Sequence, residues 1–400
     1  MTDTPYASSN AANRMSVGLV MILAGLAAIG ALSTNIILPA FPALANELHV
    51  SQRDLGVTLA TFFVAFAFGQ LLVGPLSDRF GRRPLVVGGL AVFLIGTFLC
   101  ISADKLDTLI LGRVIQALGV CAASVLSRAI ARDLFEGEAL SRSLSLTMIA
   151  MAAAPGFSPL LGGLLASAFG WQATFVFVGL AALLLGTFYV VGVGETLHAS
   201  HRRAQSIAVV GQDYFYLIRL RHFTQPALAV GLVVGGIYAF FGATPAILIG
   251  GMGFTPIELG LFFAATVFIV FAAGLMAPRM ARRLGSANAA VIGASIAFIG
   301  GIILLLLGKD IGLTGFSTAV TAFLFGVGLV TPLGTAMTLQ PFANHAGIAS
   351  ALLGFLQMLF AALGTTLATS LPFSPITSLG VVLVGGTVPS IAFLLLQRGE

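Results

Sequence analysis

Long apolar runs dominate this 400-residue chain and recur from one end to the other. A bilayer core about 30 Å thick is crossed by about 20 residues of α-helix. Spanning β-strands would instead give short segments of alternating polarity. The sequence therefore predicts an all-α membrane protein with twelve transmembrane helices. The runs lie at about 17–40, 55–76, 84–103, 107–131, 142–168, 172–194, 226–250, 257–280, 287–308, 312–338, 346–370 and 376–397.

The composition excludes the other broad classes of protein. Hydrophobic residues make up 58% of the chain and charged residues 8%, whereas soluble domains carry about 25% charged residues. A soluble globule is excluded because so few charges cannot cover its surface, and disorder is excluded because the apolar content is too high. The net charge of +5 arises from short clusters between apolar runs, so nucleic acid is not an expected partner.

Basic residues are divided unequally between the two sides of the predicted bundle. With the N-terminus inside, the outer loops carry only Arg53, Lys105 and Lys309. The positive-inside rule then places both termini in the cytoplasm. The inner loops and inner helix ends carry Arg14, Arg79, Arg82, Arg83, Arg128, Arg132, Arg142, Arg202, Arg203, Arg219, Arg221, Arg279, Arg282, Arg283 and Arg398.

The twelve spans fall into two groups of six. The predicted domains are a cytoplasmic tail at 1–14, a six-helix bundle at 15–194, a cytoplasmic linker at 195–222 and a second six-helix bundle at 223–400. Such pseudo-symmetric halves are the internal symmetry of one large transporter architecture.

A constant offset of 204 residues relates the two halves. Residues 54–56 (Asp-Leu-Gly) align with 258–260 (Glu-Leu-Gly), and Gly81 aligns with Gly285. The second span therefore resembles the eighth span, including its charged inner exit.

The loop after the second span reads GPLSDRFGRRP over residues 74–84. Gly74 and Gly81 permit close packing and a tight turn, and Asp78 can face the positive end of a helix. The arginines can bridge to carboxylates or to lipid phosphates. A plain positive-inside anchor is the alternative interpretation. The arginines are Arg79, Arg82 and Arg83.

Three further stretches narrow the interpretation, namely LPAFP at 38–42, GRVIQALG at 112–119 and APGFSPLLGG at 154–163. Together with residues 74–84, they resemble motifs of the major facilitator superfamily. Within it, they resemble the drug:proton antiporters, and in particular the bicyclomycin and chloramphenicol resistance branch. The resemblance covers most of the N-terminal half, and the C-terminal half matches loosely at 346–351.

This resemblance implies a fold, a function and a location. The fold is that of the superfamily, and the function is efflux of small amphipathic, phenicol- or bicyclomycin-like drugs by alternating access in exchange for protons. The location is a bacterial inner membrane. The resemblance also implies that Asp78 and Arg82 latch the halves together in the outward-facing state, with Asp133 as the partner of Arg82. We expect a monomer without cofactor or metal ion.

The fifth span is expected to pack at the interface between the halves. Pro155 and Pro159 interrupt its hydrogen-bond ladder, while Gly156, Gly162 and Gly163 let a neighbouring helix approach closely. A bent helix with a small face can limit leaks during transport. Packing without a gating role is the alternative.

Arg113 lies several residues inside the fourth span. An arginine near the bilayer centre costs at least about 2.5–3.5 kcal/mol, so it must face protein or a water-filled cavity. We expect Arg113 to line the central cavity or to tune a proton site, with Gln116 and Asn35 as polar neighbours. Snorkelling to the outer interface is the alternative.

Asn35 is the main departure from the family pattern, because the branch usually has an acidic residue just before the Leu-Pro of span one. Asn cannot ionise, and no acidic residue lies deep inside a span. Proton coupling would therefore use Asp133 or Asp78. A cavity with Arg113 and no carboxylate would prefer neutral or anionic substrates.

Two side chains are the main candidates for contact with substrate. Tyr238 lies in the seventh span and Gln357 in the eleventh, where a mid-span amide usually seeks a polar partner inside the bundle. Aromatic candidates of lower weight are Phe62, Phe66, Phe241 and Phe355.

An enzyme is not expected. All five histidines lie outside the spans, and the chain has no phosphate-binding loop of the GxxxxGK[ST] type. The remaining alternative is an exporter or uniporter of a native metabolite without proton coupling. Asn35 favours that alternative, whereas the motifs of spans four and five favour drug:proton antiport.

Overall fold

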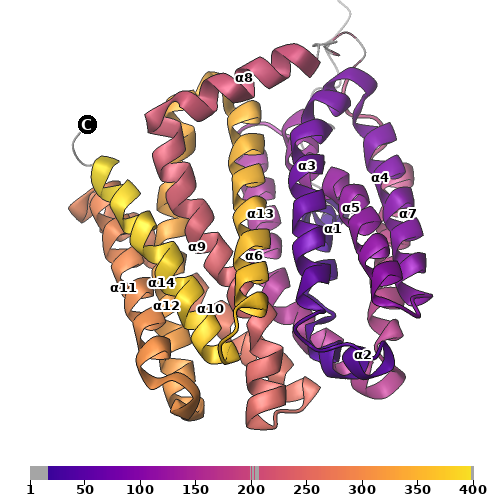
Figure 1. Ribbon diagram of the computed structural model, residues 1–400. Helices are drawn as coiled ribbons and strands as arrows, with labels where there is room; N and C mark the ends of the chain where they lie inside the picture. The colour runs from indigo at the N-terminus through magenta and orange to yellow at the C-terminus, as the bar shows by residue number, and fades with distance from the viewer. Residues whose placement is uncertain (1–16, 199, 201, 203–206, 398–400) are drawn as a thin grey trace, which may run out of the picture.

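The computed structural model describes residues 17–198, 200, 202 and 207–397, and it is a bundle of long helices (Figure 1). Twelve helices are long and apolar enough to cross a membrane, as predicted. The predicted tail at 1–14 lies outside the described residues, as do Arg14, Arg203 and Arg398.

The first half contains six spans, and the first of them is broken. It begins as α1 (Val17–Asn35) and continues through a 3-10 turn (Leu38–Ala40) into α2 (Phe41–Glu47). Pro39 and Pro42 explain the break, because a proline cannot donate a backbone hydrogen bond within a helix. The other five spans are α3 (Gly56–Phe80), α4 (Arg82–Ile101), α5 (Leu106–Leu134), α6 (Gly137–Phe169) and α7 (Gln172–Gly192).

The second half repeats the same order of six spans. The seventh and tenth spans run on past their α-helical parts, through a π-helical turn at Ala246–Gly251 and a 3-10 segment at Gln340–His345. The α-helices are α9 (Arg221–Pro245), α10 (Pro256–Leu284), α11 (Ser286–Leu307), α12 (Gly312–Leu339), α13 (Ala346–Ser370) and α14 (Pro375–Leu396).

The structure supports the internal repeat with matching helix ends. Helix α3 ends at Phe80 and α10 ends at Leu284, which are 204 residues apart. The glycines that follow them both adopt positive φ, +99° at Gly81 and +83° at Gly285. Only glycine enters this region without a steric penalty, so each half makes the same tight turn after its second span.

The repeat extends to the turn that precedes each of these helices. The backbone N–H of Ser51 donates to the Asp54 carboxylate at 2.9 Å, and that of Thr255 donates to Glu258 at 2.8 Å. The Ser51 hydroxyl also donates to Asp54, at 2.7 Å, and this bond together with that of the Ser51 backbone N–H lowers the pKa of Asp54 below its ordinary value. The offset of 204 residues therefore describes local structure as well as sequence.

The linker at 195–222 contains a helix that we did not predict, α8 (Ile207–Arg219). It is too short to span a bilayer and lies across one end of the bundle (Figure 1). Its Leu217 is buried, and its Tyr214 hydroxyl donates to the carbonyl of Leu71 at 3.0 Å. We call this the linker end, and the end that carries α2 the opposite end.

The main helix pairs between the two halves are α6 with α10 and α3 with α13, and the 3-10 turn at Leu38–Ala40 also contacts α9 and α10. Near the opposite end, Arg53 donates to the carbonyl of Phe373 at 2.7 Å. A Cβ atom added at Gly56 would meet Thr369, and one added at Gly163 would collide with the carbonyl oxygen of Pro256. Small residues thus let the halves approach to backbone contact, which is how helices associate in lipid.

Gly163→Ala tests this contact. The added methyl group would press on the backbone of the other half, and overpacking of this kind costs about 1–3 kcal/mol. We expect a lower melting temperature for the purified protein in detergent. Gly88→Ala is the matched control, because no atom lies near its missing Cβ. Equal melting temperatures for the two variants would contradict the contact.

Candidate functional site

A cavity of about 350 Å³ lies between the two halves, with walls from helices of both. Part of the wall is apolar and rich in aromatic and thioether groups. These are Phe62, Phe63, Phe66, Met148, Met151, Tyr238 and Met358. The polar part consists of the Arg128 guanidinium and of scattered hydroxyl and amide groups, namely those of Thr34, Gln70, Ser124, Thr331, Thr335, Ser350 and Gln357. This mixture is typical of sites for small organic molecules.

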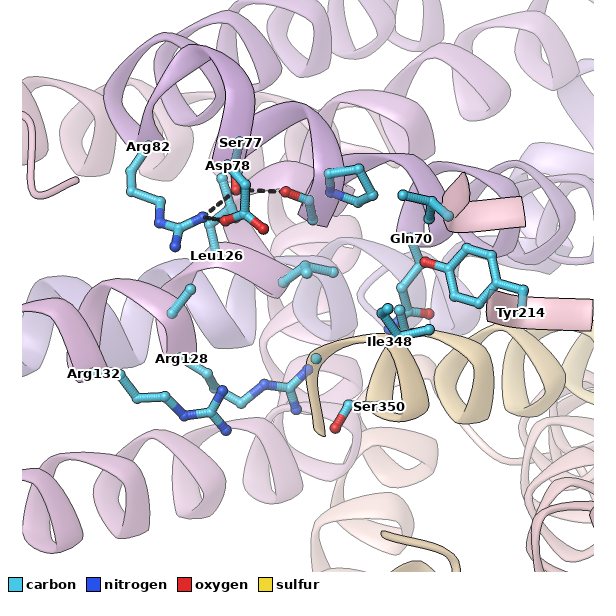
Figure 2. Close-up of a pocket in the computed structure, with 17 residues that line it drawn as sticks. Gln70, Ser77, Asp78, Arg82, Leu126, Arg128, Arg132, Tyr214, Ile348 and Ser350 are labelled. Atoms are coloured by element: carbon cyan, nitrogen blue, oxygen red, sulfur yellow. Dashed lines mark hydrogen bonds and ion pairs between the residues drawn. The ribbon is translucent and has the colours of Figure 1, made fainter. Parts of the chain in front are cut away.

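The central cavity opens toward the linker end. A second cavity, of about 270 Å³, lies there (Figure 2). It shares Gln70, Val125, Arg128 and Ser350 with the first. Contacts between the halves, such as that of Arg53 with Phe373, occupy the opposite end. The structure is therefore open on one side of the bundle and packed on the other.

The two main substrate-contact candidates both line the central cavity, as predicted. Tyr238 and Gln357 belong to the second half. The ring of Tyr238 packs against Phe63 of the first half, with ring centroids 4.4 Å apart. Tyr238 therefore joins the two halves at the level of the cavity.

The aromatic candidates divide into two groups. Phe62 and Phe66 line the cavity. Phe241 and Phe355 are not among its lining residues. The ring of Phe241 packs against that of Phe263, with centroids 5.2 Å apart, and the ring of Phe355 packs against that of Phe68, with centroids 5.6 Å apart.

Arg113 lies one layer behind the cavity wall, which corrects the prediction that it lines the cavity. Its side chain is fully buried, and Nη1 donates to the Ser33 carbonyl at 3.0 Å and to Gln116 Oε1 at 2.9 Å. The guanidinium lies 4.3 Å from the ring centroid of Phe62, which itself lines the cavity. Gln116, also behind the wall, donates to Thr97 at 2.8 Å.

This environment stabilises the Arg113 charge with neutral groups alone. A carbonyl, an amide oxygen and an aromatic face all attract a guanidinium. Its Nε and Nη2 atoms have no hydrogen-bond partner among the described residues. The side chain is directed into the half-bundle, so it does not snorkel to the surface.

Asn35 is also buried away from the cavity, which corrects the prediction that it neighbours Arg113 there. Its amide donates to the carbonyl of Ala31, one turn earlier in α1, at 2.9 Å. The preceding residue, Thr34, lines the cavity instead. Adjacent residues on a helix point in different directions, so Asn35 can be buried while Thr34 faces the cavity. Asn35 is the last residue of α1, and its amide hydrogen-bonds a backbone carbonyl of the same helix.

The residues predicted to form a latch are brought together at the linker end. Arg82 contacts Asp78 at 2.7 Å and also donates to Ser77 (Figure 2). It contacts Asp133 at 3.0 Å. The predicted pairing of Arg82 with Asp133 is confirmed. All of these residues belong to the first half, so the contacts hold α3, α4 and α5 together in this conformation. The role as a latch stays a prediction.

The second half cannot form the same ion pairs. At the offset of 204 residues, Arg282 stands in place of Asp78 and Ser286 in place of Arg82. The charged cluster is therefore asymmetric, as the sequence indicates.

Glu195 is a member of this cluster that the sequence did not reveal. Its carboxylate accepts the backbone N–H groups of Arg82 at 2.9 Å and Arg83 at 3.2 Å, at the start of α4. An anion is favoured there because a helix N-terminus carries partial positive charge. A Cβ atom on Gly81 would collide with this carboxylate. Glu195 follows the sixth span, and no local spacing connects it with residues 81–83.

Burial works against the charge of Glu195, but its hydrogen bonds outweigh this effect. Backbone N–H groups of Leu197, Arg82 and Arg83, with Arg202 nearby, lower the pKa of the Glu195 carboxyl below its ordinary 4.5. Because folding lowers this pKa, the stabilisation is present at neutral pH and is lost as the pH falls through the folded-state pKa.

Helix α6 occupies the interface, as predicted. A Cβ atom on Gly156 would collide with Val267 of α10, and the carbonyl of Pro159 lies against Gly260. Gly162 instead faces the carbonyl of Ile36, which belongs to the same half. Pro155 lies within the same helix, one residue before Gly156. A gating role for this helix stays a prediction.

Glu195→Gln should destabilise the protein at neutral pH. It removes the charge that caps α4, and losing such a cap costs about 0.5–2 kcal/mol. We expect a lower melting temperature at pH 7 and a difference from wild type that shrinks below about pH 4. Glu136→Gln is the control, because Glu136 is exposed and makes no cap hydrogen bond. A difference that does not depend on pH would contradict the charge argument.

Arg113→Lys should also destabilise the protein. An ammonium group lacks the flat fork that binds two acceptors while stacking on a ring. We expect a clear drop in melting temperature, whereas Arg283→Lys, at an exposed position, should leave it unchanged. A melting temperature equal to that of wild type for the Arg113→Lys variant would show that any buried cation is enough to stabilise this site.

Comparison with known proteins agrees with this architecture. The family model described as Major Facilitator Superfamily matches residues 23–365. A bicyclomycin resistance protein homologue of Haemophilus influenzae is 26% identical, over 88% of this chain and 89% of its own. A chloramphenicol resistance protein of Pseudomonas aeruginosa is 28% identical, over 88% and 84%. These relatives belong to the branch that the sequence motifs indicate.

A solved structure shows the same fold. It is a bacterial homologue of the human lysosomal transporter Spinster in an inward-facing and occupied conformation. It superimposes with a TM-score of 0.70 at 16% sequence identity, over 96% of this chain and 94% of that protein. With twelve spans in two repeated halves and a cavity between them, the chain belongs to the major facilitator superfamily and is a membrane transporter rather than an enzyme.

Proposed function

We propose that this transporter exports small amphipathic compounds of the phenicol or bicyclomycin type by alternating access. The cavity between the halves carries this proposal, because it opens at one end only and its wall mixes aromatic, thioether and hydroxyl groups. Such a site suits compounds with an apolar body and a few polar groups. The drug-resistance relatives support the same class of substrate.

The linker end faces the cytoplasm in this proposal. Most basic residues of the described chain lie at that end, whereas Arg53 and Lys105 lie at the opposite end, which agrees with the positive-inside rule for a bacterial inner-membrane protein. The cavity would then load from the cytoplasm, and closing of the linker end would release its contents on the other side. Because one chain supplies the whole cavity wall, we propose that the monomer is the working unit.

We further propose that export is driven by exchange for protons, as in the antiporters that the motifs resemble. Asp78 is the candidate carrier, since it is half-exposed and lines the cavity at the linker end. Its charge is balanced by Arg82, so a proton on Asp78 would remove one of the two ion pairs of that arginine and leave the pair with Asp133.

One observation favours the uncoupled alternative, export or uniport of a native metabolite. No carboxylate is among the residues that line the central cavity in the described part of the chain. Asn35, at the usual acidic position, cannot bind and release a proton. A proton gradient would not be needed in that case.

Efflux of radiolabelled chloramphenicol from cells that express the chain tests the proposal. We expect lower accumulation than in cells without it, and a protonophore should abolish the difference. Efflux that survives the protonophore would favour the uncoupled alternative. Absence of transport for chloramphenicol and for bicyclomycin would contradict the proposed function.

Asp78→Asn tests the latch in the same assay. The amide keeps the size of the side chain and removes the charge that holds Arg82. We expect efflux to slow several-fold at unchanged protein level, since closing of the linker end would lose a charge-assisted contact. Asp104→Asn is the control in an exposed loop at the opposite end. An unchanged rate in the Asp78 variant would rule out the latch.

A further inference from the structure

One cation stands on the wall of the central cavity. Arg128, from α5, is the single charged side chain among the described residues that line this cavity. It lines the cavity at the linker end as well, so it stands where the two meet. A compound that moves from the linker end to Tyr238 and Gln357 would therefore pass its guanidinium.

Arg128 has no internal counter-ion. No hydrogen bond or ion pair joins it to another residue in the part of the chain that the structure describes. Asp78, the carboxylate on the wall of the cavity at the linker end, binds Arg82 instead. Figure 2 shows the side chains of Arg128 and Arg132 extending from α5 toward the start of α13, near Ser350. This region of the passage thus carries positive charge that the protein does not neutralise.

Two polar groups beside Arg128 also lack partners. The Ser124 hydroxyl and the Gln70 side-chain oxygen are buried without a hydrogen bond, and both residues line the central cavity. Ser124 lies four residues before Arg128 in α5, so both side chains share one face of the helix. The Ser124 hydroxyl and the Arg128 guanidinium thus lie one helical turn apart on the wall of the same cavity, and neither has a hydrogen-bond partner among the described residues.

Arg128 is partly buried. A partly buried charge without a counter-ion is costly, and a bound anion would relieve that cost. The guanidinium offers a planar fork that matches a carboxylate, and Ser124 can donate a further hydrogen bond. Beyond this pair, the wall turns aromatic, with Phe62, Phe66 and Tyr238 available to an apolar body.

From these observations we infer that the transporter prefers amphipathic organic anions, and that Arg128, assisted by Ser124, binds their carboxylate. The aromatic body would then lie against Phe62, Phe66 and Tyr238. This inference rests on the proposed export by alternating access, and it changes the preferred substrate from uncharged phenicol- or bicyclomycin-like compounds to organic anions. It also moves the source of anion preference from Arg113, whose guanidinium is buried behind Phe62, to Arg128 on the wall.

Matched acid and amide pairs test the preference. We would measure binding of 2-naphthoate and 2-naphthamide, and of biphenyl-4-carboxylate and its carboxamide, to the purified full chain by calorimetry. Each pair keeps the aromatic body and changes only the charge. The acids should bind at least about tenfold more tightly than their amides, as expected for a charge-assisted hydrogen bond in a desolvated site.

Arg128→Gln assigns the effect to this residue. Binding of the acids should weaken about 10- to 100-fold, while amide binding should change little. Arg128→Lys should restore part of the preference, because it restores the charge without the fork. Arg283→Gln is the control, since Arg283 is exposed and lies outside both cavities.

The outcomes separate this inference from the proposed function. If chloramphenicol is exported but no acid binds more tightly than its amide, the anion preference is wrong and the export function stands. If Arg128→Gln weakens acids and amides equally, Arg128 shapes the cavity without reading charge, and the inference is again wrong. If neither neutral nor anionic compounds are transported, both are overturned.

Discussion

Close contact between helix backbones at one end of the bundle is the feature on which the rest of the structure depends. In a bilayer, an apolar side chain gains little free energy by moving from lipid to a helix interface, because both surroundings are apolar. Helices therefore associate where small residues permit tight packing. Gly156 and Gly163 of α6 place its backbone against α10, and Gly260 does the same from the other side. With the opposite end packed in this way, the space between the halves opens at the linker end.

Burying a charge is costly, so the role of each arginine depends on the partners that surround it. Arg82 has two carboxylates and fixes three helices of the first half. Arg113 has only neutral acceptors and the ring of Phe62, so it supports the wall from behind. Arg128 has no hydrogen-bond or ion-pair partner among the described residues, and we propose that its charge serves a ligand. The same side chain thus serves as structural tie, packing support and candidate binding group, according to what surrounds it.

Hydropathy predicted all twelve spans, because a bilayer sets the length and polarity of anything that crosses it. The repeat also followed from the sequence, since it depends on local motifs at fixed helix ends, whereas the Arg82–Asp133 pair was implied by the resemblance to the family. The sequence did not predict the direction of the Arg113 side chain. An arginine inside a span gives the same sequence pattern whether it faces a cavity or other protein. Glu195, α8 and the role of Arg128 depend on segments that meet only after folding.

The most direct test of alternating access is a pair of distances between spin labels, measured by double electron–electron resonance. One pair, on Glu138→Cys and Arg282→Cys, reports the linker end, and the other, on Ser102→Cys and Phe373→Cys, reports the opposite end, with Cys100 and Cys121 replaced. When chloramphenicol is added during turnover, the first distance should shorten and the second lengthen as the halves rock around the cavity. Distances that stay fixed, or that change in the same direction, would contradict this mechanism.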